Sequence, residues 1–260
     1  MRDFTLHVYE AILETARNSG YILESYEAFI DRGQTGKSYI LRHDVDARPL
    51  QSLRTAKIEA SLNVRGTYYF RAVPQSHVPV IVREIASLGH EIGYHYEDLA
   101  HAHGNFEKAY DQFCKNLELF RTYYPVRTIC MHGSPLSRWD NRKLWERYDY
   151  RKSGIIAEPY FDTDFRNVFY LTDTGRKWNA SNSSIRDKVV SGFDIHIAST
   201  FDLIEKLNAG KMPSQIMQNI HPQRWIDDHL LWTQEFVIQN LKNIAKRFIA
   251  GRNRKADLPV

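Results

Sequence analysis

The chain has 260 residues and a formal net charge of +4 at pH 7, with 43% hydrophobic and 25% charged residues. This length allows one barrel-sized domain or two small ones. No Gly/Ser-rich or Pro-rich linker, internal repeat or low-complexity tract divides the sequence. We therefore expect a single domain over residues 1–260, with a helix at 4–18 and a basic tail at 250–260 as appendages.

The sequence also predicts a compartment. No run approaches the roughly twenty consecutive apolar residues that a membrane-spanning helix needs. The N-terminus passes directly into a helical pattern without the apolar core of a signal peptide, so we expect a cytoplasmic protein. Cys114 and Cys130 form neither a disulfide framework nor a CxxC metal pair, which predicts two isolated buried thiols.

Apolar strands alternate with amphipathic helices through most of the chain, which is typical of a parallel sheet with right-handed crossovers. The pattern loosens between Asn179 and Ser191, which predicts a loop over the rim of the sheet. In chain order we predict helices over 4–18, 49–62, 78–88, 105–122, 200–209 and 226–249, strands over 38–44, 66–70, 91–95, 127–131 and 215–220, and shorter pieces at 140–148, 153–157 and 167–172.

The first strong strand ends in two carboxylates. The apolar run 39–41 is followed by Asp44 and Asp46, which the alternation of a strand places on one face. In α/β enzymes, catalytic and metal-binding groups lie at the carboxyl ends of parallel strands. The alternative is a structural role in which Asp46 caps a helix beginning near Pro49.

Three later strand-like runs end in histidine. His95 ends the strand-like run 91–95 within the polar segment 89–98, His132 follows the run 128–131, and His221 follows the run 216–220. A lone histidine at such a place is more often a hydrogen-bonded structural residue than a ligand. The repetition at successive strand ends predicts a barrel-like sheet whose carboxyl-end rim collects a metal site.

These motifs together carry a family resemblance. With HDVD at 43–46, GHEIGYH at 89–95, CMHGSP at 130–135 and NIHP at 219–222, the chain resembles the polysaccharide deacetylase superfamily (NodB homology, carbohydrate esterase family 4). Within it, the chain is most similar to deacetylases encoded in O-antigen and surface-polysaccharide loci. The resemblance implies a distorted, TIM-like, seven-stranded (β/α) barrel with outer helices. It also implies one divalent metal, usually zinc with cobalt or nickel as alternatives, and hydrolysis of an N-acetyl or O-acetyl group on a sugar.

The resemblance also implies roles for individual residues. Asp44 matches the catalytic base, Asp46 the metal-binding aspartate, His95 the first histidine ligand and His221 the general acid. A second histidine ligand usually follows four residues after the first, where this chain has Leu99. Leucine cannot bind a metal, whereas a hydrolytic zinc normally has three protein ligands and a water.

His132 is our first candidate for the missing ligand, because it ends a neighbouring strand where the third motif begins. The third motif usually supplies an arginine that orients the base, but this chain has none there, so we consider Arg42 and Arg71 instead. The remaining candidates for the third ligand are Glu97, Asp98, His101 and His103.

Substrate contacts are expected at the rim from Arg71, Arg176 and Trp178, because guanidinium groups and aromatic faces suit a sugar that carries a carboxylate or phosphate. A structural role is an equal alternative for each. The expected substrate is an acetylated sugar, free in an oligosaccharide or linked to a nucleotide or a lipid. The rival functions are a metal phosphoesterase, which usually has two metals, and a non-catalytic carbohydrate-binding protein on the same fold.

Basic residues cluster only at the C-terminus. No aromatic platform accompanies them, which favours a solvated helix end and excludes a nucleic-acid site as the main interpretation. Peripheral contact with an anionic membrane surface stays open, because lipid-linked sugar intermediates are handled there. The group comprises Lys242, Lys246, Arg247, Arg252, Arg254 and Lys255.

Overall fold

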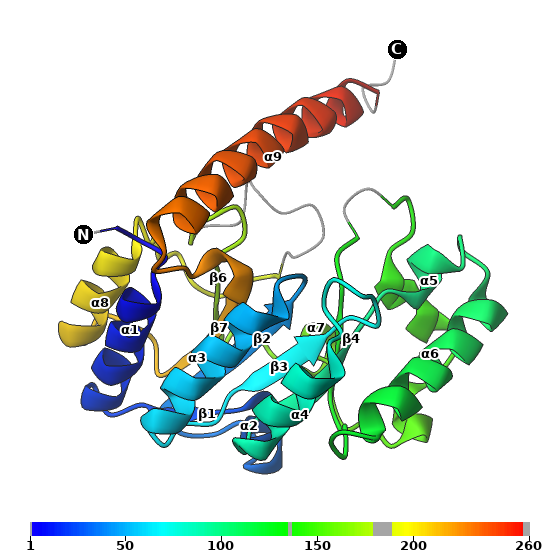
Figure 1. Cartoon of the computed structure of the whole chain (residues 1–260), viewed down its shortest axis with the longest axis horizontal. Coiled ribbons are helices and arrows are strands. Elements are labelled where there is room, and N and C mark those ends of the chain that lie inside the picture. The colour runs from blue at the N-terminus through cyan, green and yellow to red at the C-terminus, as the bar shows by residue number, and fades with distance from the viewer. Residues whose placement is uncertain (1, 135–136, 179–188, 257–260) are drawn as a thin grey trace.

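A single curled parallel sheet organises the molecule (Figure 1). The computed structural model describes residues 2–134, 137–178 and 189–256. The sheet has seven strands in the order β5-β4-β3-β2-β7-β6, with β1 paired to β2, and every pair is parallel. The strands are β1 Ile22–Glu24, β2 Ser38–Val45, β3 Thr67–Phe70, β4 Glu91–Tyr96, β5 Ile129–Met131, β6 Phe169–Thr172 and β7 Gln215–Ile220.

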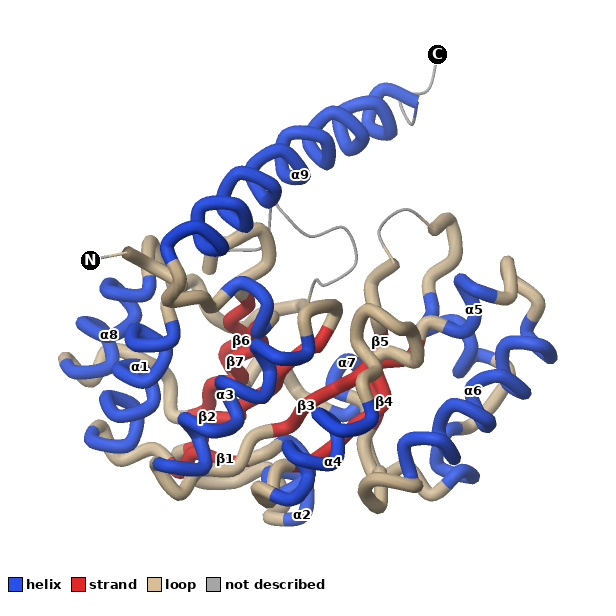
Figure 2. The backbone as a smooth tube through the Cα atoms, viewed as in Figure 1, coloured by secondary structure: helices blue, strands red, loops and turns tan. Residues whose placement is uncertain are grey.

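Helices cover the outside of this sheet, and β-strands lie between them (Figure 2). The predicted distorted barrel of parallel strands with outer helices is thus confirmed. The α-helices are α1 Leu6–Asn18, α2 Tyr26–Asp31, α3 Pro49–Ser61, α4 Pro79–Ser87, α5 Asp98–His101, α6 Phe106–Arg121, α7 Pro159–Asp162, α8 Thr200–Asn208 and α9 His229–Ala256, and 3₁₀ turns are η1 Asn141–Glu146, η2 Tyr150–Ser153 and η4 Pro222–Arg224.

Most predicted elements lie within a few residues of the observed ones, but five short elements were not predicted: β1, α2, α5, α7 and η4. These elements are too short to carry a clear period. β1 is held by its pairing with the start of β2, and α2 begins at the N-cap residue Ser25. The predicted loop over 179–191 falls largely outside the described residues. The helix expected as an appendage at 4–18 is instead part of the fold, since Tyr9, Ile12 and Leu13 of α1 are buried in the core.

Strand alternation divides the side chains of β2 between two environments. Tyr39 and Leu41 point outward into the apolar layer beneath the helices. Ile40 points the other way, into a cluster inside the barrel with Met217 of β7 and Phe29 of α2. This inner cluster fills one end of the barrel, so that the polar residues further along the strands, at their carboxyl ends, lie at the other end.

One glycine of the second motif is required by this packing. A Cβ atom on Gly93 would lie 2.3 Å from the ring of Tyr69, which projects into the barrel from the neighbouring strand. Tyr69 in turn hydrogen-bonds Thr128 beside β5 at 2.9 Å. Any side chain at position 93 would therefore displace Tyr69 and separate the strands that carry the predicted site.

The prediction of two isolated buried thiols is confirmed for Cys130 but not for Cys114, which is only partly buried. Both cysteines are free thiols. No helix among the described residues is both long enough and apolar enough to cross a bilayer.

Candidate metal centre

Polar side chains from the ends of β2, β4 and β5 converge at the carboxyl end of the barrel. Asp46 follows β2, His95 belongs to β4 and His132 follows β5, and their ligand atoms lie within 4.8 Å of one another. The Nε2 atoms of His95 and His132 lie 3.7 and 3.5 Å from Asp46 Oδ1. His221, which follows β7, brings its Nε2 atom to 3.7 Å from Asp46 Oδ2. Four side chains predicted at the site therefore surround one point.

The orientation of His95 is fixed by the backbone of the next strand. Its Nδ1 atom lies 3.0 Å from the carbonyl oxygen of Cys130, so Nδ1 carries the proton and Nε2 faces the centre. Burial lowers the pKa of His95 to about 4, and the charges of His132 and Arg42 act in the same direction against Asp44 and Asp46. The ring is therefore neutral, which is the form that binds a metal.

His132 is held by a carboxylate that the sequence analysis considered as a ligand. His132 Nδ1 lies 2.8 Å from Glu97 Oε2, and Arg71 donates to both oxygens of Glu97 at 2.7 and 2.8 Å. Burial would raise the pKa of Glu97, but hydrogen bonding to His132 and the charges of His132 and Arg71 lower it to about 2. Glu97 therefore positions the His132 ring, with Nε2 directed toward Asp46.

His221 has a comparable partner in Asp173, which the sequence analysis considered only as a turn cap. His221 Nδ1 lies 2.6 Å from Asp173 Oδ1. Arg224 and the indole N–H of Trp225 donate to the same carboxylate at 2.6 and 2.9 Å. Burial would raise the pKa of Asp173, but the charge of Arg224 and the interaction with His221 lower it to about 2. The ionised Asp173 therefore positions the His221 ring, with Nε2 directed toward Asp46.

Asp46 has the property that a bound cation would explain. Its Oδ1 atom is buried and has no hydrogen-bond partner. Burial acts to raise the pKa of Asp46, but electrostatic interaction with the surrounding histidines, first His132 and then His221, lowers it below its usual range. Asp46 does not cap α3, whose N-cap residue is Arg48 without a side-chain hydrogen bond. One carboxylate and two imidazoles around an unpaired buried oxygen fit a divalent ion such as zinc.

Asp44 lies beside this cluster, but both of its carboxylate oxygens already accept hydrogen bonds from protein groups. Arg42 donates to its two oxygens at 3.0 and 2.7 Å, and Asn219 of β7 donates to Oδ2 at 3.0 Å. Burial would raise the pKa of Asp44, but Arg42 and, to a lesser extent, His95 lower it well below its usual range. The guanidinium of Arg42 also lies 5.0 Å from the ring of Tyr160. The arginine expected near the base thus comes from the same strand.

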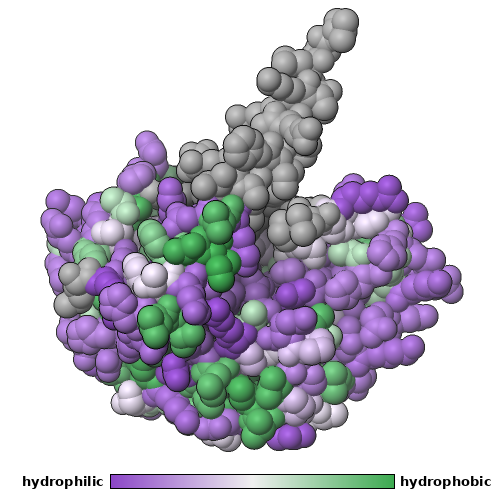
Figure 3. Space-filling model, turned by 45° about the horizontal axis from the view of Figure 1, so that its top comes forward, coloured by the Kyte–Doolittle hydropathy of each residue, from purple (hydrophilic) through white to green (hydrophobic). Residues whose placement is uncertain are grey.

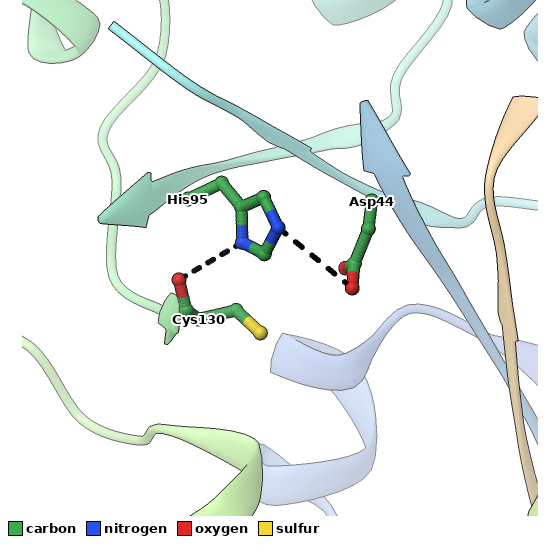
Figure 4. Close-up of side chains that lie close together, drawn as sticks. All are labelled: Asp44, His95 and Cys130. Atoms are coloured by element: carbon green, nitrogen blue, oxygen red, sulfur yellow. Dashed lines mark hydrogen bonds and ion pairs between the residues drawn. The ribbon is translucent and has the colours of Figure 1, made fainter. Parts of the chain in front are cut away.

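A second group of ligand-type atoms shares His95 with the first. It comprises Asp44, His95 and Cys130, all buried (Figure 4). Figure 4 shows the His95 ring between the Asp44 carboxylate and the Cys130 carbonyl, to which its nitrogens are joined. Because Asp44 already accepts hydrogen bonds from Arg42 and Asn219, the group around the unpaired Asp46 oxygen fits a metal better.

The structure does not bring the other candidate ligands to the centre. Leu99 is fully buried in the layer between the sheet and the helices. Asp98 accepts hydrogen bonds from Tyr94 and Asn116. His101 and His103 are exposed on and after the short helix α5. His101 Nε2 lies 3.6 Å from Glu97 and not beside Asp46.

Two of the expected substrate contacts lie in the core. Trp178 is 3% exposed and stacks on Phe4, and its indole N–H donates to Thr200. Arg176 is 9% exposed, and its guanidinium lies 4.7 Å from the ring of Trp232. Burial of both side chains does not support a contact with substrate. Arg71, the third candidate, is partly exposed but uses its guanidinium to hold Glu97.

Fold and geometry together define a parallel α/β barrel with a candidate metal centre at the carboxyl ends of its strands. No protein-family model and no curated protein matches the chain. Among solved structures, the chain is similar to a Streptococcus mutans CE4 esterase, with 14% identity over 90% of each chain and a TM-score of 0.47. It is also similar to the peptidoglycan deacetylase PdaC from Bacillus subtilis (D285S mutant), with 11% identity over 82% of this chain and 98% of that one and a TM-score of 0.40. The Bc1960 peptidoglycan N-acetylglucosamine deacetylase is similar at 14% identity over 80% of this chain and 84% of that one, with a TM-score of 0.40.

Proposed function

We propose that this protein is a metal-dependent hydrolase that removes an acetyl group from an acetylated sugar. The observation that carries the proposal is the convergence of Asp46, His95 and His132 around an unpaired carboxylate oxygen. Asp44 and His221 lie beside this group. The motif resemblance, which covers roughly residues 39–222, supports acetylated sugars as the substrate class.

Asp46, His95 and His132 would hold the metal, which we propose to be zinc, with cobalt and nickel as alternatives. These residues provide the three protein ligands that a hydrolytic zinc site needs, while one position stays open. When bound, the ion supplies Lewis-acid polarisation of the acyl carbonyl and a lowered pKa of water. Glu97 and the Cys130 carbonyl fix the two imidazoles in the tautomer that binds through Nε2.

Asp44 is proposed as the general base. The paired hydrogen bonds from Arg42 keep its carboxylate ionised and prevent its rotation. The Oδ2 atom lies 3.8 Å from His95 Nε2, so a water that attacks the carbonyl near the ligands is within reach of the carboxylate. Arg42 acts through Asp44 and is a positioning residue.

His221 is proposed as the general acid. Its Nε2 atom faces the same centre at 3.7 Å from Asp46 Oδ2, and Asp173 fixes the ring through Nδ1. A proton at Nε2 can therefore be delivered to the leaving nitrogen or oxygen of the sugar. Base and acid come from β2 and from the end of β7, which are paired neighbours in the sheet.

We further propose that the substrate belongs to O-antigen or other surface-polysaccharide synthesis, as a nucleotide-linked, lipid-linked or oligosaccharide precursor. The motif resemblance supports this narrower assignment. A phosphoesterase with two metals is less favoured, because among the described residues the two candidate metal groups share His95 and Asp44 is occupied by Arg42. A pure binding protein would need neither Asp44 nor His221.

The test is acetate release by the zinc-loaded protein. The probes are UDP-N-acetylglucosamine and N-acetylchitopentaose for the amide, and 4-nitrophenyl acetate for the ester. We expect release from at least one probe, inhibition by a chelator, and loss of release in Asp44→Asn. Release that is unchanged in Asp44→Asn, or no release from any of the three probes with zinc, cobalt or nickel, would contradict the proposal.

A further inference from the structure

The C-terminal helix α9 packs on the body through a mixed aromatic and polar side: Trp232 donates to the Asp3 carbonyl oxygen, and Arg176 lies over the rings of Trp232 and Phe236. Glu235 and Gln239, which lie one turn apart, are 7% and 4% exposed. Glu235 pairs with Arg48 at 3.4 Å, and Asn243 donates to the carbonyl oxygen of Gly175 at 3.0 Å. An amphipathic helix of a globular protein normally turns its apolar side toward the core. In α9, by contrast, buried polar residues share the inward side with the aromatic rings, and a set of aliphatic side chains is left exposed.

The apolar side of α9 faces solvent. We call Leu230, Val237, Ile238 and Leu241 the apolar stripe, and their exposed fractions are 74%, 50%, 41% and 61%. At 100° per residue these positions fall within one arc of about 100° on the side away from Glu235 and Gln239. The sequence continues the same spacing with apolar residues at 244, 245 and 248. The visible face of the body, by contrast, is mainly hydrophilic with separate hydrophobic patches (Figure 3).

The charges of α9 are asymmetric along its length. Glu235 is its one acidic residue, and from position 236 to 256 every charged residue is basic. Figure 1 shows the C-terminal part of the helix extending away from the barrel. The basic residues of this part are Lys242, Lys246, Arg247, Arg252, Arg254 and Lys255.

We infer that α9 is a membrane-surface helix whose apolar stripe enters the headgroup region of a bilayer rich in anionic phospholipids. An apolar side combined with basic residues on the same helix is the pattern of interfacial helices. Each lysine or arginine near an anionic surface adds about 1 kcal/mol of attraction. No described helix is suited to spanning the bilayer, so α9 would lie along the surface.

A second copy of the chain fits this surface less well. Two α9 helices side by side in parallel would place the same basic residues against each other. In an antiparallel pair the basic ends would need acidic partners, but Glu235 is the one carboxylate of the helix and is turned inward to Arg48. Anionic headgroups therefore complement the positive charge of α9, whereas the α9 helix of a second copy carries the same positive charge and would repel it.

The test is co-sedimentation of the full chain with phosphatidylcholine vesicles, with and without phosphatidylglycerol. We expect binding that requires phosphatidylglycerol and weakens as salt is raised. Leu241→Glu removes an apolar contact and adds a negative charge, so it should weaken binding about tenfold. Val80→Glu makes the same change in charge at a 65% exposed residue of α4 and should bind like the wild type.

Thermal unfolding of each variant shows whether the fold is kept, which we expect because both positions are exposed. The inference is overturned by absence of binding to phosphatidylglycerol vesicles, or by equal binding of Leu241→Glu and wild type. It is also overturned if sedimentation velocity shows a dimer that Leu241→Glu dissociates. None of these outcomes depends on the metal centre.

Discussion

Two histidine–carboxylate clusters lie on opposite faces of the same strands, and only one has the geometry of a metal site. At the candidate metal centre, Asp46 is met by the Nε2 atoms of His95 and His132 at 3.7 and 3.5 Å. On the outer face of the sheet, His43 and His90 meet Glu59 of α3 at 2.7 and 3.3 Å. We call this second group the outer cluster.

The ring nitrogens of the outer cluster are already occupied. His43 Nδ1 lies 2.9 Å from the Thr67 carbonyl oxygen, and its Nε2 contacts Glu59 and the hydroxyl of Tyr9. His90 Nδ1 accepts from the Gly66 N–H at 3.1 Å, and its Nε2 donates to the Ala56 carbonyl at 2.9 Å. No ring nitrogen of this cluster is left for a metal.

The metal centre differs because each histidine uses Nδ1 for a protein partner and turns Nε2 toward one point. His95, His132 and His221 have this arrangement, and their Nε2–carboxylate distances exceed the length of a hydrogen bond. The comparison teaches that the direction of the ring nitrogens, and not the presence of histidine beside a carboxylate, distinguishes a candidate ligand set from a structural pair.

The largest expected effect is on turnover and comes from Asp44→Asn. The adjacent residue His43 faces the other side of the sheet and provides the control. Loss of the proposed base should lower the turnover of acetate release by about 10²–10⁴-fold while zinc stays bound. His43→Asn, at the adjacent position on the other face, should keep the turnover of the folded protein. The measurement is kcat for acetate release together with zinc content. Loss of zinc in Asp44→Asn would instead make Asp44 a ligand.

The next largest effect is on stability and comes from Glu59→Ala. Removing the carboxylate leaves His43 and Tyr9 without their buried partner, so the free energy of unfolding should fall by about 3–5 kcal/mol. Zinc bound per folded chain should not change. Urea denaturation and elemental analysis test this comparison. A variant that loses zinc but keeps its stability would place a metal in the outer cluster.

A smaller effect is expected from Glu97→Gln, which alters the partner of His132. Positioning partners of metal ligands typically contribute 10–100-fold to metal affinity, so zinc should bind weaker by about that factor. Asp98→Asn is the matched control, because Asp98 bonds Tyr94 and Asn116 and should not affect zinc. Competition with a chromogenic chelator measures both affinities. A greater loss in Asp98→Asn would return Asp98 to the list of ligands.

The smallest effect concerns pH and the outer cluster. Burial lowers the pKa of His90 below its ordinary value of 6.5. The unfolded chain therefore binds a proton at this residue that the folded chain does not, and stability is lost as the pH falls below about 6.5. His90→Gln should flatten this part of the stability–pH curve, as measured by urea denaturation at several pH values. An unchanged slope would show that His90 titrates alike in both states.

Much of the fold follows from local sequence, because strand and helix periods are local properties. The alternation in β2 predicts that Asp44 and Asp46 share a face, and strand ends predict that His95, His132 and His221 meet. Pairings between distant segments are not local. Glu97 with His132 and Asp173 with His221 join residues 35 and 48 positions apart.

The sequence alone also did not predict which large polar or aromatic side chains are buried. Trp178 follows a strand in a segment with the composition of a binding loop, yet its ring packs beside Phe4 and Trp225. Arg42 lies in the middle of a fully buried strand, where a charge is expensive unless it is paired. Its pairing with Asp44 depends on the inside of the barrel, which only the closed sheet creates.

Metal content per chain tests the central claim most directly. Protein purified without chelator is supplied with zinc, and elemental analysis compares the wild type with Asp46→Ala and with Glu59→Ala. The account predicts about one zinc ion in the wild type and in Glu59→Ala, and none in Asp46→Ala. Zinc that is retained in Asp46→Ala, or absent from the wild type, would contradict it.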